Sequence, residues 1–314
     1  IHLIIMANSK LDNSNISKHL GQSSQYKSTY DKGLLVREPR SNNREYLNIF
    51  DDALPFVGSD TWNAYECSFL LKNGRPVTGV VKCVYSCSSK YIVESKSIKL
   101  YFNSFNMTKM GDGNNEAVKN FEEISARDLS ELLQTDVKIS FHSGVRVNKK
   151  TSSPDSEWAI EQYLNVDLLD DSKDVVYTQY TEDPSLLEAV SRSRDLEQKF
   201  YSGLLKSNCR VTSQPDWGDV FIHIKSKNTV DAHSILKYII SFRDECHFHE
   251  EICECIYKRL QDAFDPSELL VMCLYARRGG IDINPVRASS NDLIKRFAKP
   301  LVDPEMVHIK TSKQ

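Results

Sequence analysis

Long apolar runs are missing from this chain of 314 residues, and none approaches the roughly 18 residues of a membrane-spanning helix. An excess of basic charge is missing too. The formal net charge is -3, so we expect no direct nucleic-acid partner. Residues 1–5 have no basic leader, which argues against a secretion signal. We expect Met6 to be the natural start, residues 1–5 to be an upstream remnant, and the protein to be cytoplasmic.

Several common catalytic signatures are also absent. There is no P-loop and no nucleophile elbow, and Gly111-Asp112-Gly113 does not follow an expected strand, so a Rossmann-type fingerprint is not indicated. The eight cysteines include no CxxC pair. The neighbouring residues that could suggest zinc are Cys246, His247, His249, Cys253 and Cys255. They do not form an HExxH pattern, so we expect free thiols and no metal site.

Alternating and helical apolar patterns predict an α+β fold. The expected elements of the first half are a hairpin at Tyr65–Leu71 and Val77–Tyr85 around Asn73-Gly74, a helix at Ile98–Phe105, a second helix from near Ser125, and a strand at Val137–Phe141. Those of the second half are a strand at Val220–Ile224, helices at Ile235–Phe242 and about Asp244–Ala263, and a final strand at Leu270–Leu274.

The two halves repeat the same order of elements. Residues 94–105 align without a gap on residues 231–242, and five of the twelve positions are identical. We therefore predict two modules. Between them, residues 155–183 hold nine acidic side chains and one lysine, which is typical of a solvated connector. The expected domains are a polar arm at 1–45, an N-terminal module at 46–150, an acidic connector at 151–195 and a C-terminal module at 196–314.

The stretch from Ser207 to Asp219 has the residues best suited to covalent chemistry. Cys209 and Asp216 lie seven residues apart with Gln214-Pro215 between them, so we expect a shaped loop rather than a regular strand. A lone cysteine is more often a small buried hydrophobe, but the polar neighbours argue against burial here. A nearby arginine, or a carboxylate that accepts the proton, would make Cys209 a nucleophile.

Two basic segments could bind phosphate. Lys96 and Lys99 lie on one face of a helix start that Ser95 or Ser97 could cap, although ordinary surface lysines would look the same. Near the end of the chain, Arg277–Gly280 combines two arginines with two glycines that allow close approach to the backbone. A basic turn is the simpler alternative there.

The segment Phe248-His249-Glu250 begins a predicted helix. His249 could relay a proton near neutral pH, and Glu250 could accept two hydrogen bonds from a planar N–H/NH2 edge such as that of guanine. A capping histidine and a surface glutamate would give the same pattern. Taken together, these residues leave an amidase, a nitrile-processing enzyme and an acyl transferase open.

Four separated motifs together resemble one family. They are Glu94–Tyr101, Ser207–Trp217, Phe248–Glu250 and Arg277–Pro285, and the polar arm from Leu20 adds further matches. In this order they are similar to the NADPH-dependent 7-cyano-7-deazaguanine (preQ0) reductases of queuosine biosynthesis, the QueF family, in its long two-module (type II) form. The Glu-Ser-Lys segment matches the nicotinamide-nucleotide motif of that family.

The resemblance implies tandem tunnelling-fold (T-fold) modules, each an antiparallel sheet with paired helices, that assemble into barrels with ligands at module interfaces. It implies an oxidoreductase of tRNA modification that reduces the nitrile of preQ0 to the aminomethyl group of preQ1 with two NADPH. It also implies a homodimer or higher homo-oligomer. In this family Cys209 would add to the nitrile carbon as a thioimide, and Asp216 would donate and relay protons.

The resemblance also assigns the remaining site residues. The catalytic set is Cys209, Asp216 and His249. The substrate-binding set is Val93, Glu94, Ser95, His249 and Glu250. The NADPH-binding set is Ser95, Lys96, Lys99, Arg278 and Gly279. The alternatives are an amidinotransferase-like enzyme on the same scaffold that needs no NADPH and a non-catalytic purine-binding module. A zinc cyclohydrolase-like role would require stoichiometric metal.

Overall fold

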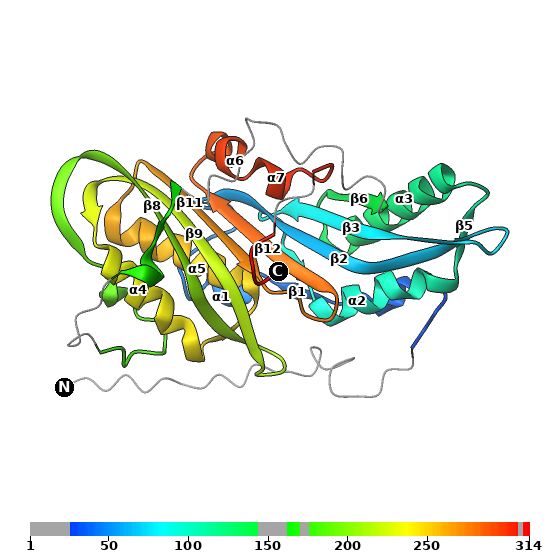
Figure 1. The fold of residues 1–314 in the computed structure, drawn as a ribbon, viewed down its shortest axis with the longest axis horizontal. Helices are drawn as coiled ribbons and strands as arrows, with labels where there is room; N and C mark the ends of the chain where they lie inside the picture. The colour runs from blue at the N-terminus through cyan, green and yellow to red at the C-terminus, as the bar shows by residue number, and fades with distance from the viewer. Residues whose placement is uncertain (1–25, 144–161, 170–175, 307–309) are drawn as a thin grey trace.

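The computed structural model describes residues 26–143, 162–169, 176–306 and 310–314, so the expected start at Met6 lies outside it (Figure 1). Its main sheet has the order β10-β8-β9-β11-β12-β2-β3-β6, with β5 on β2 and β7 on β8, while β1 and β4 form a separate pair.

The strands are β1 Arg37–Pro39, β2 Val57–Leu71, β3 Pro76–Ser86, β4 Tyr91–Val93, β5 Lys109–Gly111, β6 Val137–Ser143, β7 Leu164–Asn165, β8 Ala189–Cys209, β9 Pro215–Val230, β10 Cys246–His247, β11 Glu268–Tyr275 and β12 Ile281–Ala288. The helices are α1 Ser41–Arg44, α2 Ser95–Ser104, α3 Asn114–Leu133, α4 Ala232–Ile240, α5 His249–Phe264, α6 Asn291–Phe297 and α7 Lys299–Val302. None of the described helices is long and apolar enough to cross a membrane.

In the first module the predicted hairpin, first helix and strand are confirmed as β2–β3, α2 and β6. The second helix was placed too late. It begins at Asn114 rather than near Ser125, because Ala117 and Phe121 extend its buried stripe toward the N-terminus. The argument that Gly111-Asp112-Gly113 follows no strand was also wrong, since β5 ends at Gly111. This strand is three residues long, too short for apolar periodicity to reveal.

In the second module the sequence patterns missed two long strands. β8 ends at Cys209, and β12 follows the strand that was expected to be the last. The segment around Cys209 is therefore mostly strand, and only residues 210–214 form the turn that was predicted to be longer. The helix expected from Asp244 begins at His249, because Cys246–His247 pair with β8 instead. β8 starts at Ala189, and the domain boundaries themselves stay a prediction.

The two modules share one sheet because β12 pairs with β2. The antiparallel register runs from Ile281 opposite Ala64 to Ala288 opposite Val57. The strands approach so closely that a Cβ on Gly58 would lie 2.0 Å from the carbonyl oxygen of Val286. Any other residue at position 58 would push the strands apart, so this glycine fixes the seam between the modules.

Helices cover both faces of this sheet (Figure 1). α2 and α3 form one apolar core with the first-module strands, and α4 and α5 form another with β9 and β11. On β11, Val271 and Cys273 face the core of α5, while Leu270, Met272 and Leu274 face α6 and α7. A strand that is buried on both faces is apolar at nearly every position. The alternation of apolar residues in this strand therefore could not show that helices cover both of its faces.

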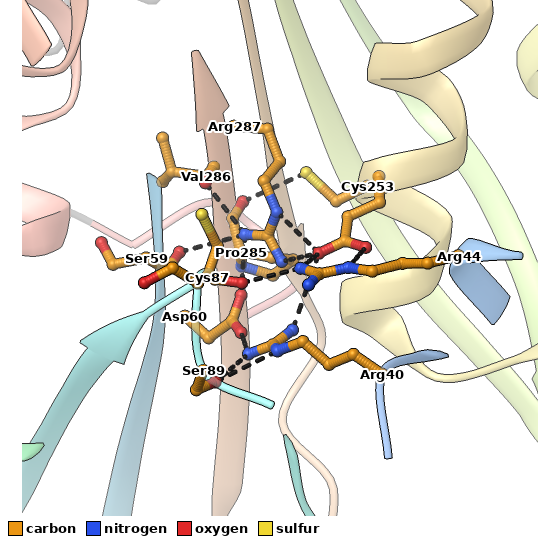
Figure 2. A network of polar contacts seen from close by, with 12 residues as sticks. Arg40, Arg44, Ser59, Asp60, Cys87, Ser89, Cys253, Pro285, Val286 and Arg287 are labelled. Atoms are coloured by element: carbon orange, nitrogen blue, oxygen red, sulfur yellow. Dashed lines mark hydrogen bonds and ion pairs between the residues drawn. The ribbon is translucent and has the colours of Figure 1, made fainter. Parts of the chain in front are cut away.

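A cluster of buried charges lies where the modules and the N-terminal arm meet (Figure 2). Arg287 of β12 donates to Asp60 of β2 at 2.8 Å and to Glu254 of α5 at 2.8 Å. From the arm, Arg44 donates two hydrogen bonds to Glu254 at 2.7 and 2.9 Å, and Arg40 pairs with Asp60. We call these five residues the seam network. It connects the arm and β2, near the start of the chain, with α5 and β12 of the second module.

Replacing Glu254 by glutamine should lower the free energy of unfolding by about 3 kcal/mol, because it leaves buried guanidiniums with too little negative charge. The urea midpoint, followed by circular dichroism, measures this. Glu123→Gln is the matched control, because Glu123 forms only an exposed helical pair with Lys119 and should change stability by less than about 0.5 kcal/mol. Equal midpoints for the two variants would contradict the assignment of the seam network as a stabilising contact.

Candidate active site

The structure brings all the predicted site residues together around one cavity of about 240 Å³. Three segments of the second module and two of the first contribute to its wall. The predicted residues that line it are Val93, Glu94, Ser95, Lys96, Lys99, Cys209, Asp216, His249, Glu250, Arg278 and Gly279. A cavity of this kind, apolar with a few convergent polar groups, is the usual form of a small-molecule site.

Cys209 is the last residue of β8 and reaches the cavity from a tightly bonded turn. Its N–H donates to the carbonyl of Gln214 at 2.8 Å, and the N–H of Ser213 donates to the carbonyl of Cys209 at 2.9 Å. Ser213 has a φ of 53°, the left-handed conformation that closes the turn. The thiol is free and partly exposed. The strand end thus presents the sulfur to the cavity from a fixed backbone.

Asp216 follows in β9 and is paired with two cationic or protonatable groups. Arg278 forms an ion pair with one carboxylate oxygen, and His249 Nε2 lies 3.3 Å from the other. Burial favours the neutral acid, but His249 and Arg278 outweigh burial and hold the pKa of Asp216 below its ordinary value. Asp216 is therefore ionised at neutral pH.

His249 is the first residue of α5, and its ring is clamped in place. It stacks on Tyr275 with ring centroids 3.7 Å apart and an interplanar angle of 7°. With Nε2 toward Asp216, the buried Nδ1 has no hydrogen-bond partner among the described residues. A buried polar atom without a partner at a cavity wall is a position that a ligand or a water molecule would satisfy.

Glu250 also lines the cavity and, like His249, has a buried polar atom without a hydrogen-bond partner among the described residues. Its side chain is buried, and its Oε1 finds no partner within the described ranges. Burial, followed by the negative charge of Asp60, raises the pKa of Glu250 to about 8, although Arg40 and Arg287 oppose the shift. An unsatisfied carboxyl oxygen is suited to accept an N–H from a ligand.

Glu94 has a structural contact that the sequence did not reveal. Its two carboxylate oxygens accept hydrogen bonds from Lys96 N at 2.9 Å and Ser97 N at 2.7 Å, so Glu94 caps α2. The expectation that Ser95 or Ser97 would be the cap was wrong. Asp231 caps α4 in the same way, which matches its place in the internal repeat. Glu94 is thereby held rigidly in the cavity wall.

One side of the cavity is basic. Lys96 and Lys99 of α2 and Arg278 all line it. Gly279 and Gly280 have φ of 57° and 80°, and a Cβ on Gly279 would lie 3.1 Å from Lys99 Nζ. The turn therefore depends on glycine, and the Lys99 side chain packs directly on Gly279, which places its ammonium group at the turn.

Residues 26–141 match the family profile described as nitrile reductase, 7-cyano-7-deazaguanine-reductase N-term, and residues 215–293 match the one described as QueF-like protein. An NADPH-dependent 7-cyano-7-deazaguanine reductase of Colwellia psychrerythraea is 39% identical over 273 residues, 86% of this chain and 91% of that protein. The protein of the same name from Rickettsia massiliae is 41% identical over 285 residues, 89% of this chain and 97% of that one. The chain belongs to this reductase family.

Family membership and the observed modules confirm the predicted tandem T-fold of antiparallel sheet and paired helices. Assembly into barrels stays a prediction. Among solved structures, the archaeosine synthase QueF-Like in the apo form matches 31% of this chain and 95% of its own at 17% identity, with a TM-score of 0.27.

Sequence reasoning missed several residues of the reductase cavity. The additional lining residues are Trp62, Thr212, His247, Phe248, Ile281 and Ile283. Most of them belong to the quoted motifs, but Trp62 and His247 do not. Burial would lower the pKa of His247, but hydrogen bonds with Glu245 and Glu251 raise it to about 9, which makes this side chain a cation at neutral pH. Trp62 is on β2, and only the pairing of β2 with β12 brings it to the cavity.

Proposed function

We propose that this chain reduces the nitrile of 7-cyano-7-deazaguanine to an aminomethyl group with two NADPH, through a thioimide on Cys209. One observation carries the proposal. A single cavity holds a nucleophilic thiol, an ionised carboxylate, an unsatisfied glutamate and a basic, glycine-lined side. Relatives about 40% identical over most of their length are named as this reductase.

Cys209 and Asp216 perform the first step. As the sulfur attacks the nitrile carbon, Asp216 accepts the thiol proton, and one π bond of the nitrile is replaced by the S–C bond. Asp216 then returns that proton to the nitrile nitrogen, which gives a neutral thioimide. An ionised Asp216 is required at the start of this sequence, and the pairs with His249 and Arg278 keep it ionised.

The substrate is oriented by the two buried glutamates. Glu250 accepts N–H groups from the aminopyrimidinone edge through its unsatisfied oxygen. Glu94, fixed by its bonds to the start of α2, closes the same wall with Val93 and Ser95. His249, flat against Tyr275, lies beside Asp216, where it exchanges protons with it.

The residues that would hold NADPH are Ser95, Lys96, Lys99, Arg278 and Gly279. Each of two NADPH molecules would supply one hydride, and the two hydrides together with two protons would complete the four-electron reduction. Arg278 also bonds Gln214 at 2.8 Å and pairs with Asp216, so a phosphate and Asp216 would share this side chain. This chain's own contribution is to place the positive charges of Lys96, Lys99 and Arg278 beside the glycine turn.

The test is incubation of purified protein with the nitrile, with and without NADPH. Without NADPH, intact mass should show an adduct equal to the mass of the nitrile. With NADPH, two equivalents should be oxidised for each aminomethyl product. If the adduct forms and the nitrile is consumed but NADPH is not oxidised, an amidinotransferase-like reaction is favoured. If the nitrile binds without forming an adduct, a purine-binding module is favoured.

Two further expectations belong to the same proposal. We infer that the enzyme is cytoplasmic, because its eight cysteines are all free, as expected in a reducing compartment, and that it forms a homodimer or a higher homo-oligomer. One end of the sheet is β6, whose outer edge is partly covered by α3, because Ser130 and Glu122 accept hydrogen bonds from Val137 N and Phe141 N.

A further inference from the structure

Three residues of the substrate cavity each have a buried polar atom without a hydrogen-bond partner among the described residues. The atoms are Trp62 Nε1, His249 Nδ1 and Glu250 Oε1. His249 and Glu250 already take part in the proposed reaction, whereas Trp62 has no role in it. A buried polar group that stays unpaired costs free energy, and at a cavity wall a bound ligand can pair with it. The unpaired N–H of Trp62 therefore indicates a ligand contact that the proposed reaction leaves out.

Trp62 belongs to the wall that forms where the two modules meet. It lies on β2, opposite Ile283 of β12, and both Ile283 and Ile281 line the cavity with it. Trp62 is 2% exposed and packs in the core of the first module. Packing alone explains an aromatic ring at this position but not the indole N–H, because phenylalanine would fill a core without burying a donor. The N–H is thus a feature that core packing does not require.

The three unpaired atoms differ in the groups that they can bind. An indole N–H only donates, and a carboxyl oxygen of Glu250 is suited to accept. His249 Nε2 lies 3.3 Å from the ionised carboxylate of Asp216, so in a neutral ring this nitrogen carries the hydrogen and Nδ1 accepts. Trp62 is therefore the member of this group that requires an acceptor atom on the ligand.

The place of Trp62 in the sheet shows which part of the substrate it can reach. β11 and β12 separate β2 from β9, which carries Asp216, and this separation puts the two backbones about 14 Å apart. Cys209 is one strand farther away, on β8. The nitrile has to lie at Cys209 and Asp216, so Trp62 approaches the other end of the substrate, the pyrimidinone ring. The acceptors of that ring are its carbonyl oxygen and the ring nitrogen N3.

We propose that Trp62 is a substrate-binding residue whose indole N–H donates a hydrogen bond to the pyrimidinone ring, at its carbonyl oxygen or at N3. The inference rests on the proposed function and deepens it, since it concerns the same cavity. With Glu250 accepting from the N–H edge, the first module supplies a donor and the second module an acceptor for one ring. The pairing of β2 with β12 brings the two groups to one ligand.

The test is calorimetric binding of 7-deazaguanine, which has the same ring and no nitrile, to folded variants of Trp62. Trp62→Phe removes the N–H and should raise the Kd about tenfold, because the acceptor of the ligand loses its partner. Incorporation of 3-benzothienylalanine at position 62 replaces only the N–H by sulfur and keeps the size of the indole ring. It should give the same rise, and it replaces Trp62→Phe in the test if the smaller ring prevents folding.

Two ligand analogues identify the acceptor. 7-Deaza-6-thioguanine has a weakly accepting sulfur in place of the carbonyl oxygen, and 3,7-dideazaguanine has a C–H in place of N3. The unaltered protein should bind one of the two about tenfold more weakly than 7-deazaguanine. The Trp62 variants should bind that same analogue within about twofold of the unaltered protein, because the hydrogen bond is already absent. A selective effect on the thioxo analogue identifies the carbonyl, and one on the dideaza analogue identifies N3.

Tyr163→Phe is the matched control. Tyr163 also has a buried hydroxyl without a partner in the described part of the chain, but it packs against Phe221 and does not line the cavity. Loss of this hydroxyl should leave the Kd of all three ligands within about twofold of the unaltered protein. Equal weakening of binding in Tyr163→Phe and Trp62→Phe would indicate a general loosening of the fold and would overturn the inference.

The outcomes separate this inference from the proposed function. If the unaltered protein binds none of the three ligands, the proposed function fails. If it binds all three equally well, or if the Trp62 variants keep the Kd of 7-deazaguanine or weaken all three ligands equally, Trp62 only packs in the wall and the inference is overturned. Tighter binding of the thioxo analogue to Trp62→Phe than to the unaltered protein would reveal a steric effect and would overturn it too.

Discussion

Replacing Cys209 by alanine will abolish the nitrile adduct and lower the rate of nitrile reduction at least about a thousandfold, because no other group in the cavity can form the S–C bond. Intact mass after incubation with the nitrile measures the adduct, and NADPH oxidation measures turnover. Cys209→Ser should give the same result, since a hydroxyl is a far weaker nucleophile than a thiol at neutral pH.

The control for this prediction is Cys246→Ala. Cys246 is also a free thiol, it lies on the strand that pairs with the end of β8, and it is more exposed than Cys209. A ligand that reacted with thiols according to their exposure alone would modify Cys246 rather than Cys209. Adduct formation and turnover should stay within about twofold of the unaltered enzyme. Turnover that survives in Cys209→Ala would overturn the covalent mechanism.

Replacing Asp216 by asparagine should slow both adduct formation and turnover by about a hundredfold to ten thousandfold, the range expected when a general base is lost. Asparagine has nearly the same shape but cannot take the thiol proton. It also ends the ion pair with Arg278 and the contact with His249. Stopped mixing followed by mass spectrometry measures the adduct rate, and the Kd of 7-deazaguanine shows whether binding remains intact.

Two comparisons make the Asp216 result specific. Asp262→Asn changes a half-exposed carboxylate on α5, far from the cavity lining, and should alter neither rate. Binding of 7-deazaguanine to Asp216→Asn should change by only a fewfold, because the residue acts on the proton rather than on the purine edge. A large loss of binding with an unchanged adduct rate would instead assign Asp216 to substrate recognition.

The residues around Cys209 show how far pattern reasoning reaches. Cysteine, carboxylate and glutamate were selected correctly as members of one cavity, because their chemical types and motif order are written in the sequence. The local structure was wrong for Cys209, since the pattern of turn-forming residues extended only over 210–214. Strand β8 has few alternating apolar residues near its end, and its pairing partners, not its own sequence, make it a strand.

The cap of α2 is a similar case. Serine at positions 95 and 97 favours capping by propensity, yet Glu94 provides both bonds. Propensity gives a preference among residue types, and the direction from which β4 enters the helix decides which side chain reaches the free N–H groups. The entry of β4 depends in turn on its pairing with β1 in the arm.

By itself, the sequence determined the α+β class, the two-module repeat, the chemical types in the site and the family. The tertiary structure alone decided that β12 and β2 join the modules, that Trp62 reaches the cavity, and that arginines of the arm meet Glu254 more than 200 residues away. The physical reason is that apolar period and motif order are local properties. Strand pairing and buried charge compensation are long-range properties, which exist only once the chain has closed on itself.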